Sequence, residues 1–148
     1  MKLVLAGGLA WKNEEFLNLL KTYKYKADVV MTGYLEQEKL ARLIASAYAL
    51  VYPSLFEGFG VPVLEAMRSN VPVLTSKDSS MQEIAEDAAL YFDPLEHQDM
   101  ADQMMLVYKN EDLRKLMIEK GKIITAKYSW ERTASLVWQC IEKAIGKE

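Results

Sequence analysis

Short apolar segments alternate with amphipathic segments over the first two-thirds of the chain. The apolar segments are nearly continuous runs, which is typical of strands in a parallel sheet that is covered on both faces. Glycine or proline follows several of these runs and ends the extended pattern. The pattern predicts strands at residues 3–6, 28–32, 49–52, 72–75 and 89–92.

Helical periodicity occupies the intervals between these strands. Apolar residues recur at three- and four-residue spacing over residues 14–25 and 36–47, which predicts two amphipathic helices. The last third of the chain contains three further helical patterns and no strand pattern. Trp130 and Trp138 are expected to anchor the last of these helices, and Cys140, between Trp138 and Ile141, is expected to be an inert core residue.

Two shorter helices are indicated by the signals at their ends. Pro62 lies in the first turn of a helix expected over residues 61–69, and Asn70 can end that helix in a left-handed conformation. Ser80 and Glu83 have the spacing of a capping box, which predicts the start of another helix at this point. Each helix would follow the end of a predicted strand.

The alternation of strands and helices predicts a fold of the α/β class. We expect three layers, with a mostly parallel sheet of about five strands and a C-terminal helical tail. The chain contains no Gly/Ser-rich linker, low-complexity tract or internal repeat, so a single domain over residues 1–148 is expected. Because parallel sheets bind ligands beyond the carboxyl ends of their strands, the candidate site comprises the loops at residues 7–8, 33–34, 53–60 and 75–80.

Composition and charge exclude several classes of protein. The 148 residues include 18 Lys and Arg against 21 Asp and Glu, so the net charge of −3 lacks the basic excess of a nucleic-acid-binding protein. With one cysteine, Cys140, and one histidine, His97, the chain cannot form an internal disulfide or a multi-histidine metal site. No apolar run approaches the ~20 residues of a membrane helix, and the first run is too short for a signal peptide, so we expect a cytoplasmic location.

One segment joins a strand to a helix through a glycine-containing loop that carries two carboxylates. It reads Pro53-Ser54-Leu55-Phe56-Glu57-Gly58-Phe59-Gly60-Val61-Pro62-Val63-Leu64-Glu65-Ala66. Gly58 and Gly60 would let backbone N–H groups approach a ligand, and the helix N-terminus that follows favours a phosphate. Glu57 and Glu65 are suited to accept hydrogen bonds from paired hydroxyls, as on a ribose or hexose. An ordinary strand–helix connection with a solvated Glu65 explains the same residues, because one Gly-x-Gly is weak evidence.

The spacing of Glu57 and Glu65 resembles a known family motif. The seven residues between them and the sequence around them resemble the E-x7-E motif of retaining glycosyltransferases of family 4, which have the GT-B fold. Further segments that resemble the family in the same order are residues 29–34, 70–76, 83–84 and 128–131. The resemblance covers essentially the whole chain and implies the Rossmann-like C-terminal domain that binds a nucleotide-sugar donor.

The resemblance also implies a role for each residue at the site. Glu57 would be the catalytic residue that contacts the transferred sugar, and Glu65 would bind the ribose hydroxyls. The loop that would hold the base comprises Gly33, Tyr34 and Leu35, and the backbone that would meet the sugar and diphosphate comprises Gly58, Phe59, Gly60 and Val61. The resemblance implies that the ligand is a nucleotide diphosphate sugar and that transfer retains the anomeric configuration of the sugar. Because the family generally uses no metal, no cofactor is expected.

Family members run to more than twice this length and hold the active site between two domains. The resemblance implies that the acceptor-binding N-terminal domain, and any peripheral membrane contact made through it, lie outside this chain. It also implies that the opening strand of the domain is missing, with the Arg and Lys that its loop supplies to the diphosphate. Lys12, after Gly7-Gly8, is the nearest basic candidate to replace them at the diphosphate, but it belongs to the next loop and is expected to be simply exposed. We therefore expect the flanking strands to pair directly, or another chain to fill the gap, and donor affinity on the order of millimolar.

The sequence thus predicts the donor-binding part of a hexosyltransferase of polysaccharide biosynthesis. The full enzyme would transfer a hexose to a saccharide or lipid acceptor, whereas this chain alone would be inactive and could self-associate through its exposed last helix. A nucleotide-sugar epimerase of the same fold would need a histidine or further acid in the cleft. A non-catalytic binding or assembly module would not need both Glu57 and Glu65. A dinucleotide-dependent oxidoreductase is disfavoured, because residues 6–10 lack the G-x-G-x-x-G fingerprint.

Overall fold

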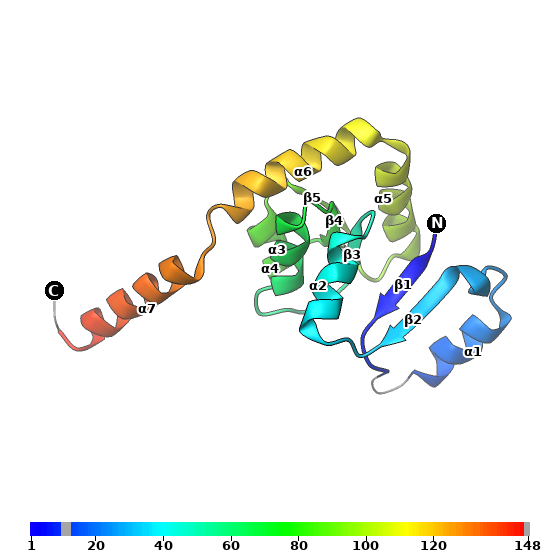
Figure 1. Cartoon of the computed structure of the whole chain (residues 1–148), viewed down its shortest axis with the longest axis horizontal. Coiled ribbons are helices and arrows are strands. Elements are labelled where there is room, and N and C mark those ends of the chain that lie inside the picture. Colours follow the sequence, from blue (N-terminus) through cyan, green and yellow to red (C-terminus); the bar gives the residue numbers. More distant parts are fainter. Residues whose placement is uncertain (10–12, 147–148) are drawn as a thin grey trace. The chain divides into compact units, whose positions relative to one another are not determined.

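The computed structural model describes residues 1–9 and 13–146 and divides the chain into two compact units. The first unit is Met1–Leu43 and the second is Ile44–Glu148. Strands and helices follow each other along the chain in the predicted order (Figure 1). That both units together form the single nucleotide-sugar-binding domain predicted for residues 1–148 stays a prediction. Lys12 lies outside the described residues.

The first unit contains a two-stranded parallel sheet. β1 (Leu3–Ala6) pairs with β2 (Val29–Gly33), and the segment between them forms α1 (Glu14–Thr22) and a short 3-10 helix, η1 (Lys26–Asp28). The predicted helix over residues 14–25 is therefore shorter than expected, because the chain turns into η1 before β2. α2 (Gln37–Ala45) then continues along the chain into the second unit.

Both strands of the first unit are apolar, yet none of the described residues of Met1–Leu43 is buried. Val4, Val30 and Met31 are 39%, 43% and 37% exposed. The first unit by itself therefore does not cover both faces of β1 and β2, and such cover stays a prediction for these two strands. An apolar run shows which side chains a strand offers, whereas cover on two faces also requires helices that pack on each of them.

The second unit contains a three-stranded parallel sheet in the order β3–β4–β5. These strands are β3 (Leu50–Tyr52), β4 (Val73–Ser76) and β5 (Ala89–Phe92), close to their predicted positions. All four residues of the central strand β4 are buried, including Thr75 and Ser76. The continuous apolar pattern therefore has its expected meaning here, because β4 has neighbours on both edges and cover on both faces.

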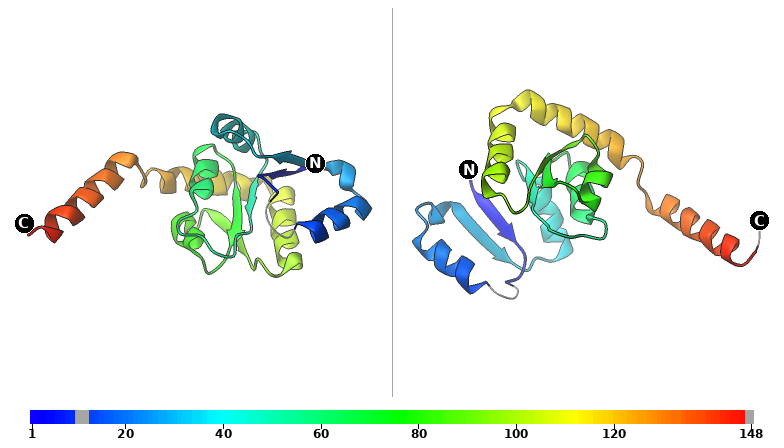
Figure 2. Two further views of the ribbon diagram at one scale, coloured as in Figure 1. Left: turned by 90° about the horizontal axis from the view of Figure 1, so that it is seen from below. Right: turned by 180° about the vertical axis from the view of Figure 1, so that it is seen from behind.

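Helices cover both faces of this sheet (Figure 2). They are α3 (Val61–Arg68), α4 (Ser80–Ala85), α5 (His97–Lys109) and α6 (Glu111–Thr125). Leu74 packs in a buried cluster with Val107 of α5 and Met117 of α6. Thr75, which alternation places on the opposite face, contacts Met81 of α4. The predicted three-layer α/β arrangement is confirmed.

Within each unit the strands are parallel to their neighbours: β1 pairs with β2 in the first unit, and β4 pairs with β3 and β5 in the second. Direct pairing of the strands that flank the missing one stays a prediction. The alternative, in which a strand from another chain occupies the gap, also stays a prediction.

The C-terminal helix α7 (Trp130–Ala144) is amphipathic but has no buried residue. Its apolar side chains include Trp130, Val137 and Trp138, which are 82%, 54% and 60% exposed. Ser129 caps the helix by accepting a hydrogen bond from the Arg132 N–H at 3.1 Å. The expectation that Trp130 and Trp138 anchor this helix is therefore wrong, because neither side chain is buried. The exposure agrees with the expected open apolar face, whereas self-association through it stays a prediction. Among the described residues, no helix is long and apolar enough to cross a membrane.

Local signals place both ends of α3. Pro62 occupies its first turn, and Asn70 follows its last residues with a φ of 58°, as predicted. Gly60 is the N-cap with a φ of 91° and a ψ of 48°, a left-handed conformation that disfavours residues with a Cβ. A Cβ built on Gly60 would lie 2.6 Å from Cγ of the buried Met81, whereas one built on Gly58 would meet nothing within 4 Å. Gly60 is therefore required by the fold, and Gly58 is not.

We predict that Gly60→Ala lowers the free energy of unfolding by about 2 kcal/mol or more, because it combines a left-handed backbone with a steric clash. Gly58→Ala is the matched control and should change stability by less than about 0.5 kcal/mol, since its Cβ enters open space. Urea unfolding followed by circular dichroism measures both values. Equal losses in the two variants would contradict this description of the loop.

We also predict that α5 contributes to the core and that α7 does not. Val107→Ala should lower the free energy of unfolding by about 2 kcal/mol, because Val107 is 1% exposed in the main cluster. Val137→Ala is the matched control on α7, where the side chain is 54% exposed and the effect should stay below about 0.5 kcal/mol. Alanine has a higher helix propensity than valine, and this gain is the same in both variants, so it does not affect their difference. Thermal unfolding with and without urea checks the difference.

Candidate functional site

The loop between β3 and α3 carries the first motif glutamate, and α3 carries the second. Glu57 is half-buried in the loop, whereas Glu65 is exposed on α3 between buried neighbours. The Tyr52 hydroxyl, at the end of β3, donates a hydrogen bond to the Glu57 Oε1 at 2.7 Å. Glu57 therefore has a defined partner in the protein, and the roles of Glu57 and Glu65 towards a ligand stay predictions.

Burial and the neighbouring carboxylate keep Tyr52 protonated. Burial raises its pKa most, and the hydrogen bond to Glu57 and the charge of that carboxylate raise it further, to about 12. The phenol is therefore a hydrogen-bond donor throughout the neutral pH range. Sequence reasoning did not identify Tyr52, because a tyrosine at the end of an apolar strand is indistinguishable from a packing residue.

The carbonyl of Tyr52, at the end of β3, and two carbonyls of the loop accept hydrogen bonds from hydroxyl groups at the end of β4 and the start of α4. The bonds are Thr75 Oγ1 to Tyr52 O at 3.0 Å, Ser76 Oγ to Ser54 O at 2.6 Å and Ser80 Oγ to Glu57 O at 2.8 Å. The side chains of Thr75 and Ser76 are buried, so these bonds also satisfy hydroxyls that would otherwise lose their contact with water. The loop and the strand end that precedes it are thus attached by two bonds to β4 and by one bond to α4.

The role of Ser80 differs from the predicted one. The N-cap of α4 is Ser79, and its side chain makes no capping bond but donates to the Ser76 carbonyl at 2.7 Å. Ser80 is the first helical residue, and its hydroxyl is bonded to the carbonyl of Glu57. The capping box predicted from Ser80 and Glu83 is therefore wrong, because a contact remote in sequence uses the hydroxyl instead.

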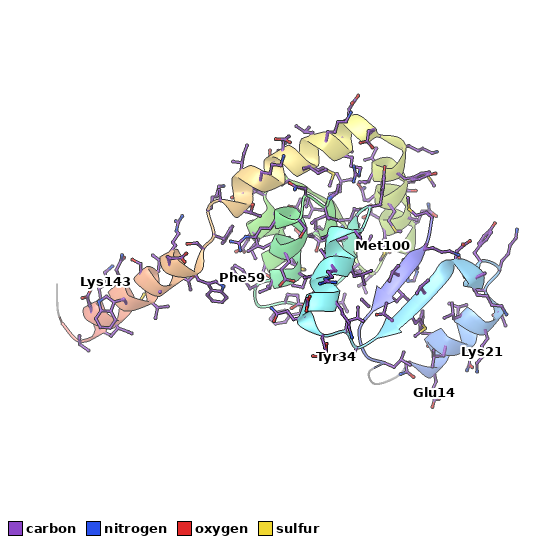
Figure 3. All side chains as sticks on the ribbon, in the orientation of Figure 1. Glu14, Lys21, Tyr34, Phe59, Met100 and Lys143 are labelled. Atoms are coloured by element: carbon purple, nitrogen blue, oxygen red, sulfur yellow. The ribbon has the colours of Figure 1, made fainter. Side chains whose placement is uncertain are left out.

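Aromatic and basic side chains attach the other side of the loop to the segment that follows α6. The rings of Phe59 and Tyr128 lie 6.0 Å apart in an edge-to-face arrangement (Phe59 is labelled in Figure 3). The Arg68 guanidinium, at the end of α3, donates to the Tyr128 carbonyl at 2.6 Å. Phe59 remains 45% exposed, so this residue is partly open to solvent.

The start of α3 offers backbone groups to a ligand. The Gly60 carbonyl accepts from the Val63 N–H at 3.0 Å, while Gly58 is exposed and Val61 is 54% exposed. N–H groups in a helix's first turn have no intrahelical acceptor, and the helix dipole places partial positive charge there. This end of α3 is therefore suited to an anion.

The predicted base-binding loop belongs to the first unit. Gly33 has a φ of 67°, and its carbonyl accepts from the Gly7 N–H at 3.1 Å and from the Thr32 hydroxyl at 2.9 Å. Tyr34 is 83% exposed (Figure 3), and Leu35 is half-buried. The ring of Tyr34 is thus available to stack on a flat ligand, and its contact with a base stays a prediction.

Metal-ligating side chains do not cluster in the part of the chain that the structure describes. No group of three or more His, Cys, Asp and Glu residues there could hold an ion. His97 is exposed at the start of α5, and Cys140 is exposed on α7 rather than in the core where the sequence placed it. The prediction for Cys140 is wrong because α7 packs on nothing that would bury it.

Comparison with known proteins identifies the family. The sequence model of the family described as "Glycosyl transferases group 1" matches residues 1–123. The chain is 32% identical over 129 residues to an O-antigen chain mannosyltransferase B of Escherichia coli, covering 87% of this chain and 34% of the relative. It is 30% identical over 126 residues to an MMP alpha-(1->4)-mannosyltransferase of Mycolicibacterium hassiacum, covering 82% and 31%. The chain therefore spans about a third of the length of these relatives.

Solved structures share the fold. Sucrose-phosphate synthase from Thermosynechococcus elongatus superposes with a TM-score of 0.87 at 22% identity, over 99% of this chain and 39% of that one. Anabaena HepE, solved in complex with UDP, gives a TM-score of 0.84 at 16% identity, over 97% and 41%. At these identities the likeness establishes the α/β fold alone. Together with the family match, it shows that the chain belongs to the group 1 glycosyl transferases, as its resemblance to the GT-B enzymes of family 4 predicted.

Proposed function

We propose that this chain is the nucleotide-sugar donor-binding domain of a retaining glycosyltransferase. The observation that carries the proposal is the Glu57 loop, which is attached to β4 and α4 at three points and leads directly into α3 and Glu65. Membership of a glycosyltransferase family makes a nucleotide diphosphate sugar the natural ligand for such a loop. Anabaena HepE, which shares the fold, is described in complex with UDP and with UDP-glucose, which supports a ligand of this class.

Each part of the ligand matches a different chemical group of the chain. The negatively charged diphosphate matches the backbone N–H groups at the start of α3, around Gly58 and Val61. Glu65, on the same short helix, accepts hydrogen bonds from the ribose hydroxyls, and Glu57 accepts them from the transferred sugar. On the family resemblance alone, residues 33–35 are proposed to bind the base. No step of this binding requires a metal or cofactor.

The transferred sugar is a hexose, and we propose mannose. The relatives that match most of this chain at 30–32% identity include two named as mannosyltransferases. The acceptor in this proposal is a saccharide or lipid, and the chain alone is inactive because it spans only about a third of these relatives. A cytoplasmic location remains part of the proposal.

The test is a titration of the isotope-labelled chain with ADP, GDP and UDP and with their sugars, followed by amide NMR. We expect shifts confined to residues 33–35 and 57–65, with dissociation constants on the order of millimolar. Shifts spread evenly over the chain, or no response to any of these nucleotides, would contradict the proposal.

We predict that Glu65→Gln weakens nucleotide binding by about threefold to tenfold, because a hydrogen bond from a ribose hydroxyl to a carboxylate is stronger than one to an amide. Glu119→Gln is the matched control, since Glu119 is also an exposed glutamate on a helix and only pairs with Lys122 at the surface. The affinities of both variants for the nucleoside diphosphate are measured by the same titration. Equal affinities in the two variants would contradict the ribose assignment.

A further inference from the structure

The hydrogen bond between Tyr52 and Glu57 joins two groups whose backbones are already fixed. Tyr52 is paired with Thr75 in the sheet, and its carbonyl accepts from the Thr75 hydroxyl at 3.0 Å. The carbonyl of Glu57 accepts from the Ser80 hydroxyl at 2.8 Å. The backbones of both residues are therefore held by hydrogen bonds from β4 and from the start of α4. The 2.7 Å bond between the phenol and the carboxylate then joins the two side chains directly.

This bond restricts the carboxylate of Glu57. A glutamate side chain has three rotatable bonds and loses much rotamer freedom when it is ordered. A donor at fixed distance from Oε1 selects the rotamers that keep the bond, and the half-buried position of both side chains strengthens it relative to a bond in water. A carboxylate can accept about four hydrogen bonds, so one bond to Tyr52 leaves capacity for the hydroxyls of a ligand.

We propose that Tyr52 is a positioning residue, which holds the Glu57 carboxylate in the orientation that accepts hydrogen bonds from the sugar of the bound donor. This inference rests on the proposed function, because it assigns the sugar to Glu57. If Tyr52 has this role, its hydroxyl contributes to the affinity that the sugar adds to the donor. The affinity for the nucleoside diphosphate alone does not depend on this hydroxyl.

Tyr91 provides a matched control for removing the hydroxyl. It lies on β5 in the same row of the sheet, since both Tyr52 and Tyr91 are opposite Thr75. Its hydroxyl donates to the Glu86 carbonyl, away from Glu57, and burial likewise raises its pKa to about 12. Tyr52→Phe and Tyr91→Phe thus remove equivalent phenol hydroxyls, of which one contacts Glu57.

The experiment measures the affinity of the wild-type chain and both variants for one nucleoside diphosphate and for its sugar, GDP with GDP-mannose and UDP with UDP-glucose. We expect Tyr52→Phe to weaken binding of the nucleotide sugar by about fivefold to tenfold and to leave the diphosphate within about twofold. Tyr91→Phe should preserve the wild-type ratio of the two affinities. Amide NMR spectra of the free variants verify that each one folds.

The outcomes separate the positioning role from the proposed function. If the wild-type chain binds none of these ligands, the proposed function fails and the inference with it. If the wild-type chain binds both members of a pair and Tyr52→Phe keeps their ratio, or weakens both equally, only the positioning role is overturned. A wild-type chain that binds the sugar no more tightly than the diphosphate also overturns it, because the sugar then contributes nothing for Tyr52 to support.

A measurement without ligand tests the contact itself. Glu57→Gln removes the charge that raises the pKa of Tyr52, so the phenol should titrate at lower pH, although burial keeps its pKa above the ordinary value. Labelling the tyrosine ring carbons resolves Tyr52 from the other tyrosines by NMR, and Tyr91 serves as the internal reference. A titration of Tyr52 that is identical in wild type and Glu57→Gln would overturn the inference, because the two groups would then not interact in solution.

Discussion

Hydrogen bonds from the end of β4 and the start of α4 determine the shape of the loop that carries Glu57. The strand supplies them from Thr75 and Ser76, whose hydroxyls are buried. Buried hydroxyls are unfavourable unless they are bonded, so the core accepts them only where a partner is fixed. The carbonyls of the loop and of Tyr52 are these partners. Without the hydroxyls, the carbonyls would need hydrogen-bond donors from water or from other parts of the protein. The polar end of β4 and the irregular backbone of the loop therefore stabilise each other.

Local signals in the sequence predicted most of the fold of the second unit. The strands were predictable from their apolar runs, of which β3 is followed by Pro53 and β5 by Asp93-Pro94, and α3 because Pro62 and Asn70 mark its two ends. The network at Glu57 was not predictable, since the three bonds that attach the loop join residues more than twenty positions apart. A polar pair at the end of a buried strand, such as Thr75 and Ser76, is the signal that could have indicated it.

The two sheets show what hydrophobic patterning leaves open. β1 and β4 both begin with apolar residues, yet β4 is completely buried and β1 is largely exposed. Burial depends on neighbouring strands and on helices on both faces, which are properties of the assembled unit and not of the strand. The same reasoning applies to α7, whose amphipathic pattern predicts a face that could be buried and whose residues are all unburied. Patterning thus identified the faces correctly and could not identify what covers them.

Glu57 and Glu65 are equivalent in the motif but not in the structure. Glu57 is half-buried and bonded to Tyr52, so its carboxylate is ordered before any ligand arrives. Glu65 is exposed on α3, so it must lose rotamer freedom when it engages a hydroxyl. In the proposed complex, the preorganised carboxylate would therefore select the orientation of the sugar. The exposed one would contribute affinity for the ribose at a larger entropic cost, because only Glu57 has its geometry fixed by the fold.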